Sequence, residues 1–176
     1  MPKIIDEARK KILQCAKRKM LDEGYNALSL RSVAKECGIA VGTIYNYFDN
    51  KDDLISAIMQ EDWDIALSQM HENCSKASHM REGMDEIYQS IDSFCKIYKD
   101  IWHQYSSTGR TCHTANKRHT VLLKQVGECI ILLLERFNYE QDIEIAPLLA
   151  EMFLSSVMQS EITLHQIDLV VERLFQ

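Results

Sequence analysis

The sequence predicts an all-α protein, and three observations support this fold class. Gly and Pro, the residues that most often interrupt helices, occur only six and two times in 176 residues. Apolar residues recur at spacings of three and four along most of the chain, as on one face of a helix. No stretch shows the apolar–polar alternation of a half-buried strand. We therefore expect about nine helices, at residues 3–23, 30–37, 41–47, 51–73, 80–99, 101–107, 116–137, 144–160 and 164–175.

The composition argues against a membrane-spanning protein and against a secreted one. No apolar run approaches the roughly 20 residues that span a bilayer, and the first residues, MPKIIDEARKK, lack the apolar core of a signal peptide. We therefore expect a soluble cytoplasmic protein. None of the six cysteines forms a Cys-x-x-Cys pair, so we expect thiols, several of which act as small apolar residues, rather than disulfides.

The charges are distributed unevenly along the chain. Residues 1–51 contain ten Lys/Arg and six Asp/Glu, a net charge of +4. Residues 52–176 contain ten Lys/Arg and twenty Asp/Glu, a net charge of −10, which gives the total of −6. This asymmetry indicates a basic module on an acidic body, although a solvated basic face would give the same numbers.

Local signals mark the ends of several predicted helices. Ser29 and Asn50 are placed to cap the helices that begin at residues 30 and 51. Thr163 and Gln166 have the spacing of a capping box for the last helix. Gly38 follows the helix at 30–37, where the chain commonly needs a positive φ.

Residues 29–48 have the pattern of a helix-turn-helix, because two short helices are joined by a tight turn that contains Gly38. The apolar residues that would close its core are Val33, Ala34, Ile39, Ile44 and Phe48. The second helix would then present a polar face to solvent, with Val41, Gly42, Thr43, Tyr45, Asn46 and Tyr47 on or near it.

This face suits a DNA partner. A recognition helix places its N-terminal residues in the major groove, and hydroxyls beside it contact phosphates. Thr43, Tyr45 and Tyr47 supply such hydroxyls, and Arg31 is placed to reach guanine O6 and N7. Lys51 would add a cation beside the N-terminus of the following helix, where a phosphate is favoured.

The stretch LSLRSVAKECGIAVGTIYNYFDNKDDL, residues 28–54, resembles the DNA-binding domain of the tetracycline-repressor-like (TetR) family, and the resemblance covers roughly residues 3–60. It implies a homodimeric, ligand-responsive transcriptional regulator, usually a repressor, that binds a near-palindromic operator. It also implies a DNA-binding domain at residues 1–50 and an effector-binding and dimerisation domain at residues 51–176. The predicted DNA-binding residues are Ser29, Arg31, Val41, Gly42, Thr43, Tyr45, Asn46, Tyr47 and Lys51.

The resemblance does not identify residues of the remaining two thirds of the chain. Members of the family usually dimerise through a four-helix bundle of two helices per subunit, and the last two helices here are rich in apolar residues. The predicted dimer residues are Met152, Phe153, Ser156, Ile167, Val171 and Leu174. For a small-molecule effector we expect a pocket between the middle helices, although most apolar residues there belong to the core. The candidate pocket residues are Tyr88, Phe94, Tyr98, Trp102, Tyr105 and Val126.

Three alternatives stay open. Cys and His residues between 103 and 119 suggest a metal- or redox-sensing regulator, but their spacings are irregular for a zinc site. The neighbouring Cys112 and His113 suggest a thiol enzyme, but catalytic Cys/His pairs are usually distant in sequence. The third alternative is a helical ligand-binding protein without DNA-binding activity, but it would not explain the polar face of the helix at residues 41–47. We expect no catalytic residues, metal ligands or cofactor.

Overall fold

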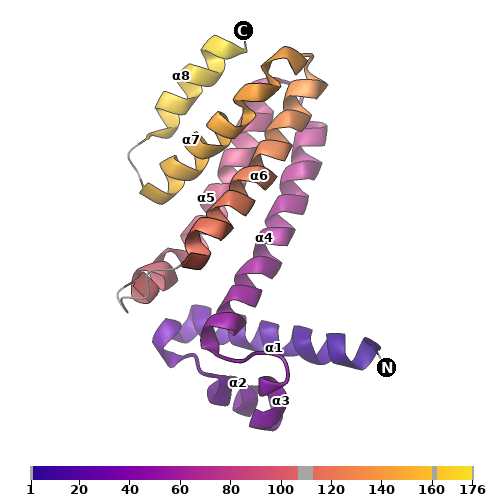
Figure 1. The fold of residues 1–176 in the computed structure, drawn as a ribbon, viewed down its shortest axis with the longest axis vertical. Helices are drawn as coiled ribbons and strands as arrows, with labels where there is room; N and C mark the ends of the chain where they lie inside the picture. The colour runs from indigo at the N-terminus through magenta and orange to yellow at the C-terminus, as the bar shows by residue number, and fades with distance from the viewer. Residues whose placement is uncertain (1, 107–112, 160–161, 176) are drawn as a thin grey trace. The chain divides into compact units, whose positions relative to one another are not determined.

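The computed structural model describes the backbone of residues 2–106, 113–159 and 162–175, and the side chains of residues 7–101, 119–158 and 162–175. These residues contain helices and no strand, which confirms the all-α class (Figure 1). The elements are α1 (Pro2–Glu23), η1 (Tyr25–Ala27), α2 (Leu30–Cys37), α3 (Val41–Tyr45), α4 (Lys51–Lys76), α5 (Met80–Ser106), α6 (His113–Arg136), η2 (Glu140–Ile145), α7 (Ala146–Gln159) and α8 (Leu164–Leu174).

The chain divides into two compact units. The N-terminal unit comprises Met1–Trp63 and the end of α5 from Asp100 onwards. The helical body comprises Asp64–Lys99 and the chain that follows α5. Helices α4 and α5 take part in both units. The predicted boundary at residue 50, which separates a DNA-binding domain from an effector-binding and dimerisation domain, stays a prediction.

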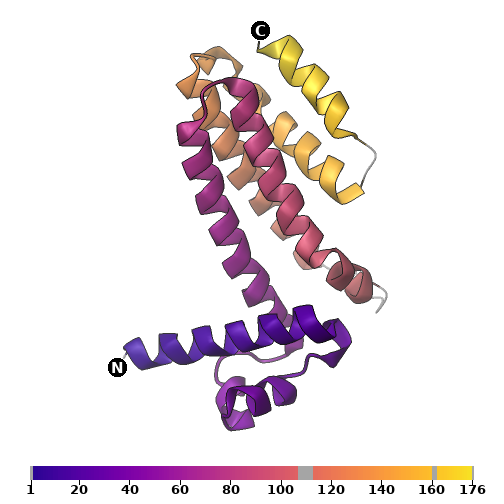
Figure 2. The same ribbon diagram turned by 180° about the vertical axis from the view of Figure 1, so that it is seen from behind.

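The core of the N-terminal unit is built around α1, whose apolar face packs on α2 (Figure 2). The buried core residues of α1 and α4 recur every three to four positions, as expected for amphipathic helices. The buried residues are Ile12, Leu13, Ala16, Met20, Val33, Ala34, Ile44, Phe48, Leu54, Ile55 and Ile58. This packing fixes the two helices of the helix-turn-helix against a rigid support.

The helical body places α7 between α6 and α8. Its buried residues include Met84, Ile87, Ile91, Cys129, Ile130, Leu133, Leu149, Phe153, Ile167 and Val171. Arg136 closes the linker between α4 and α5, because its Nε and Nη2 donate to the Ala77 carbonyl at 3.2 and 3.0 Å. Helices α5 and α6 approach closely at Gly83, where a Cβ would overlap the Leu133 side chain.

The structure differs from the predicted helices in three places. Residues 80–106 form the single helix α5 instead of two helices, because no Gly or Pro lies near the predicted break at residue 100 and buried Tyr98 and Ile101 continue the apolar period across it. Eight α-helices are therefore present in the described residues, against about nine expected. Helix α3 ends at Tyr45 rather than residue 47, and α7 begins at Ala146 after the unpredicted η2. No helix in the described residues is long and apolar enough to cross a membrane.

Candidate nucleic-acid interface

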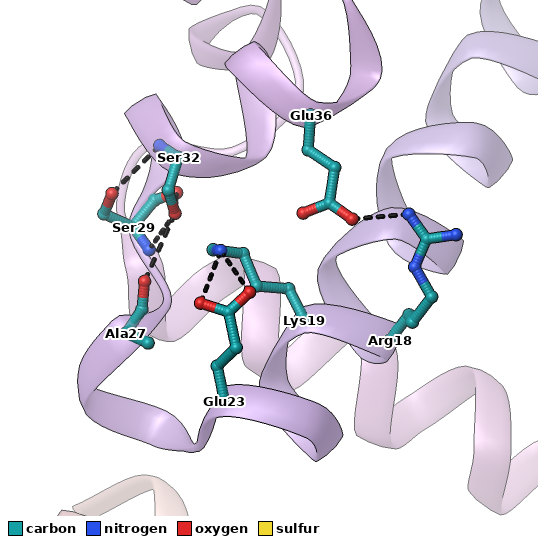
Figure 3. Close-up of polar contacts among 7 residues, drawn as sticks. All are labelled: Arg18, Lys19, Glu23, Ala27, Ser29, Ser32 and Glu36. Atoms are coloured by element: carbon teal, nitrogen blue, oxygen red, sulfur yellow. Dashed lines mark hydrogen bonds and ion pairs between the residues drawn. The ribbon is translucent and has the colours of Figure 1, made fainter.

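Helix α2 begins with a reciprocal cap at Ser29, as predicted (Figure 3). The Ser32 backbone N–H donates to Ser29 Oγ at 3.0 Å, and the Ser29 N–H donates to Ser32 Oγ at 3.0 Å. Ser32 Oγ also lies 2.9 Å from the Ser29 carbonyl. The Ser29 hydroxyl thus stabilises the helix start, although the residue stays exposed beside the predicted DNA-binding face.

The turn between α2 and α3 depends on Gly38. This residue has φ 67° and ψ 34°, the left-handed conformation that glycine adopts without a steric cost. The Gly38 N–H donates to the Lys35 carbonyl at 3.3 Å, and the Ile39 N–H donates to the Ala34 carbonyl at 3.0 Å. These bonds close the end of α2 as in a Schellman motif and set the direction in which α3 leaves the turn.

Helix α3 has a buried face and an exposed face, as predicted. Ile44 and the following Phe48 are buried in the N-terminal unit. Val41, Gly42, Tyr45 and Asn46 are exposed, with 51% of Tyr45 accessible to solvent, and Thr43 and Tyr47 are half-buried. The short helix therefore presents the predicted residues together on one side.

The polar groups of this face have no partner within the described residues. The side chains of Arg31, Thr43, Tyr45 and Asn46 make no hydrogen bond or ion pair there. Lys35 lies one helical turn after Arg31 on α2, and it is likewise exposed and unpaired among the described side chains. Sequence reasoning overlooked Lys35, although its spacing of four from Arg31 could have identified it.

Several basic residues of α1 are neutralised within the N-terminal unit. Arg18 Nη2 lies 2.5 Å from Glu36 Oε1 of α2 (Figure 3). Lys19 pairs with Glu23 at 2.7 Å on the same helix, and Lys17 Nζ lies 2.7 Å from Asp62 Oδ1 of α4. These pairs remove three of the basic residues of α1 from the charge available to a polyanion, whereas Arg31 and Lys35 of α2 keep theirs.

Lys51 makes an internal contact that the sequence did not predict. Its Nζ donates to the Tyr25 carbonyl, which belongs to η1, and lies 3.5 Å from the centroid of the Tyr25 ring. The residue is half-buried, and this loss of solvent lowers the pKa of Lys51. The Tyr25 hydroxyl lies 3.5 Å from Asp52 Oδ1, the neighbour of Lys51. The start of α4 is thus tied to the turn that precedes α2.

The predicted effector residues lie mostly inside the helical body. Phe94 and Tyr98 are buried with ring centroids 5.1 Å apart, and Val126 is also buried. Tyr88 is half-buried, and its ring meets Phe153 edge-on at 6.0 Å. The side chains of the other two candidates, Trp102 and Tyr105, lie outside the described residues.

Two hollows lined by described residues of the helical body can be compared with the size of a ligand. The first lies between α5, α7 and α8, includes Tyr88 and Phe153 in its lining, and has a volume of only about 10 Å³. The second has a volume of about 370 Å³ and is lined by Met80, Arg81, Val171, Glu172 and Phe175. The second is of ligand size, whereas the first would have to expand to admit more than a water molecule.

The predicted dimer residues divide into two groups. Phe153, Ser156, Ile167 and Val171 are buried within the single chain, where they join α7 to α8 and α5. Leu174 is exposed and Met152 is half-buried. The exposed apolar surface of these two helices consists of Leu148, Met158, Leu169 and Leu174.

The predicted Cys/His cluster at residues 103–119 lies almost wholly outside the described side chains; only His119 is described, and its Nε2 is 3.6 Å from Glu151 Oε2. Among the described residues no group of three metal-ligating side chains comes together.

Comparison with known proteins supports the assignment of the N-terminal region. Residues 12–58 match the model of the bacterial regulatory proteins of the tetR family. The HTH-type transcriptional regulator UidR of Escherichia coli is 34% identical over 96 residues, which cover 54% of this chain and 45% of UidR. The chain spans about half the length of the curated relatives that it matches.

Solved structures support the fold over the whole chain. A TetR-family transcription regulator from Marinobacter aquaeolei gives a TM-score of 0.55 at 18% identity, over 98% of this chain and 95% of that one. The regulator FadR from Bacillus subtilis, solved in complex with stearoyl-CoA, gives a TM-score of 0.56 at 17% identity, over 95% and 97% of the two chains. At these identities the likeness concerns the arrangement of the helices.

Proposed function

We propose that the chain is a transcriptional regulator, on the premise that its residues 12–58 match the model of the bacterial regulatory proteins of the tetR family. It binds a near-palindromic DNA operator as a homodimer, and a small-molecule effector releases it, as in a repressor. The observation that carries the proposal is the exposed face of α2 and α3, where the side chains of Arg31, Lys35, Thr43, Tyr45 and Asn46 make no hydrogen bond or ion pair within the described residues.

We assign most of these groups to the phosphate backbone. The hydroxyls of Thr43 and Tyr45 and the ammonium of Lys35 suit phosphate oxygens, which fix the position of the protein on the duplex. Ser29 and Tyr47 lie at the edges of the same surface. Lys51 retains two N–H donors beside the one given to the Tyr25 carbonyl, so it can hold its turn and face a phosphate together.

Base recognition falls to fewer groups. The Arg31 guanidinium is the group best suited to guanine, and the exposed amide of Asn46 suits adenine. Val41 offers a thymine methyl group an apolar contact, while Gly42 lets the backbone approach the groove, since nothing lies within 4 Å of a Cβ placed there. With few base-reading side chains, part of the specificity would come from DNA shape.

For the homodimer we propose the exposed apolar face of α7 and α8. Leu148, Met158, Leu169 and Leu174 supply its area, with half-buried Met152 beside them. The buried residues Phe153, Ser156, Ile167 and Val171, first predicted as dimer contacts, would support this face from behind. A two-fold axis through it would present two recognition helices to successive major grooves about 34–36 Å apart.

For the effector we propose a mainly apolar molecule held in the helical body. FadR, of similar fold, was solved in complex with stearoyl-CoA, whose long acyl chain supports an effector with a large apolar part. In this chain, Tyr88, Phe94, Tyr98 and Val126 would have to separate from their present partners to line a cavity. A ligand that favours the separated arrangement would shift the population away from the DNA-binding state by its difference in affinity, typically about 1–3 kcal/mol.

Selection of random duplex DNA by the purified chain tests the proposal directly. At about 150 mM salt, non-specific binding is weak, so enriched sequences report specific recognition. Recovery of one inverted repeat, bound by two copies of the chain, is the expected result. Failure of a folded, dimeric preparation to enrich any sequence, with or without cell-extracted small molecules, would contradict the proposed function.

A further inference from the structure

The N-terminal unit contains a pair of cysteines that join two helices. Cys15 lies on α1, and Cys37 is the last residue of α2. The Cys37 thiol lies against α1: its Sγ donates to the Lys11 carbonyl at 4.0 Å, and Cys15, one turn further along, is near enough to raise the pKa of Cys37. Lys11 lies one helical turn before Cys15, so both contacts place the Cys37 sulfur against the same turn of α1.

The two thiols differ in access. Cys37 is buried, whereas Cys15 is half-buried and reachable from solvent. Burial and the hydrogen bond to Cys15 raise the pKa of Cys37 to about 12, so Cys37 remains a thiol at neutral pH. Cys15 is therefore the sulfur that meets an oxidant first, and Cys37 is the sulfur that lies ready to react with the product.

The other described cysteines lack an accessible member, although Cys74 and Cys129 are near enough for Cys74 to raise the pKa of Cys129. Cys74, Cys95 and Cys129 are buried in the helical body, and burial raises the pKa of each thiol to about 11, 12 and 12. Buried thiols in apolar surroundings are typically inert. Among the five described cysteines, Cys15 is thus the one that combines access with a neighbouring thiol.

We infer that Cys15 and Cys37 form a redox-active pair, in which a hydroperoxide converts the two thiols to a disulfide between α1 and α2. Cys15 loses its proton, and the thiolate attacks the peroxide oxygen. The O–O bond breaks, Cys15 becomes a sulfenic acid, and with hydrogen peroxide as oxidant the departing hydroxide takes up the released proton and leaves as water. The Cys37 sulfur then attacks the Cys15 sulfur; the S–S bond forms, the S–O bond breaks, and the departing hydroxide takes the Cys37 proton as a second water. The pair loses two electrons, and the peroxide gains them.

The second step should be the slow one, because only a small fraction of Cys37 is thiolate at neutral pH. Sulfenic acid on Cys15 should therefore accumulate for long enough to be trapped. A thiol reductant reverses the disulfide, so the modification is not an end product.

The bond would act on the DNA-binding surface. A disulfide brings the two sulfurs to about 2.05 Å, closer than two thiols in hydrogen-bond contact. Cys37 immediately precedes Gly38, so a shift of the Cys37 sulfur towards α1 would also displace the turn at which α3 begins. This consequence rests on the proposed function, and we expect operator affinity to fall about tenfold, the worth of one disrupted base contact.

Peptide mapping of the full chain after treatment with hydrogen peroxide tests the pair. We expect a Cys15–Cys37 disulfide, the loss of two hydrogen atoms from the intact mass, and reversal by dithiothreitol. Because Cys112 lies outside the described residues, the experiment is repeated with C112S, which should give the same bond. In C37A the sulfenic acid on Cys15 should persist and react with a 1,3-dione, whereas C129A, which also removes a buried thiol, should form the disulfide as the wild type does.

The outcomes separate the modification from its effect on DNA. A folded wild-type chain that keeps both thiols, or forms only bonds with other cysteines or between molecules, would overturn the pair. A mapped disulfide with unchanged operator affinity, with C37A under the same treatment as reference, would overturn the effect on DNA alone. Lack of operator binding by the reduced chain would contradict the proposed function and leave the mapped bond standing.

Discussion

At the scale of single residues, Lys51 shows how one side chain can serve both the fold and a ligand. The sequence places it at the start of a helix, which indicates a phosphate contact. The structure adds the Tyr25 carbonyl and ring as partners, 26 positions earlier in the chain. No local pattern could predict this pairing, because it depends on the packing of η1 against α4.

Replacement of Lys51 by methionine should therefore destabilise the chain as well as weaken DNA binding. Methionine keeps much of the apolar stem but removes the charged donor to the Tyr25 carbonyl, a loss that typically costs about 1–3 kcal/mol even though the Leu28 N–H still donates to the same oxygen at 3.3 Å. Denaturant unfolding measures the loss. Lys10 on α1, exposed and without a partner among the described side chains, gives a matched control, and K10M should change the unfolding free energy by less than about 0.5 kcal/mol. Equal unfolding free energies of K51M and the wild type would contradict the structural role of Lys51 and leave only its proposed contact with DNA.

Arg31 should separate base recognition from general attraction to DNA. Because it is exposed and unpaired, R31A should unfold like the wild type. If Arg31 reads guanine, R31A loses about 1–3 kcal/mol on the operator and tolerates substitution at one position of each half-site. K35A, one turn away, should instead weaken binding to all sequences and reduce the salt slope by about one unit. Competition binding over a salt series distinguishes the two, and identical behaviour of both variants would contradict the assignment.

At the scale of elements, the helix ends were predictable because their causes are local. Ser29 caps α2, Asn50 Oδ1 accepts from the Asp53 N–H at 2.9 Å at the start of α4, and Thr163 forms the capping box with Gln166. Each signal depends on residues three positions apart, so a sequence can display it. Gly38 was predictable for the same reason.

The contacts between elements were harder to predict. The apolar face of α8 can be recognised in the sequence, but the surface that covers this face cannot. For this reason Ile167 and Val171, which are buried within the single chain, are predicted from the sequence as dimer contacts. The close approach of α5 and α6 at Gly83 has no local signature either. Such contacts follow from the packing of helices that are distant in sequence.

Two glycine substitutions should test this packing with opposite outcomes. In G83A the new methyl group overlaps buried Leu133, so the crowding should outweigh the better helix propensity and destabilise the body by about 1–3 kcal/mol. In G127A, on α6, the methyl group meets no atom within 4 Å, so the chain should gain up to about 1 kcal/mol from helix propensity. Thermal unfolding of the pair measures both. A stabilised G83A would show that α5 and α6 are not packed this closely.

At the scale of the whole molecule, the charge asymmetry of the sequence takes on a physical meaning. Many basic residues of α1 are paired with acids of the same unit, whereas Arg31 and Lys35 remain open to solvent on α2. The excess of acidic residues after residue 51 would keep the body away from a polyanion. Together these charges would orient the chain with its helix-turn-helix towards DNA.

The proposed dimer face leads to a prediction about the whole assembly. Leu148 on α7 is 62% exposed, although it is a large apolar residue. In L148E each copy would bring a carboxylate to an apolar two-fold interface, and an unpaired buried charge costs about 3–5 kcal/mol. We therefore expect L148E to sediment as a monomer at micromolar concentrations where the wild type is a dimer, without a change in helical content.

Operator binding should follow the assembly state. A monomer holds one recognition helix, so L148E should bind an isolated half-site as the wild-type monomer does but lose the gain from the second half-site. L21E on α1, which also charges an exposed leucine, is the control for oligomerisation and should remain a dimer. A dimeric L148E would place the interface elsewhere, and a monomeric L148E with full affinity for the palindrome would show that operator binding does not require the dimer.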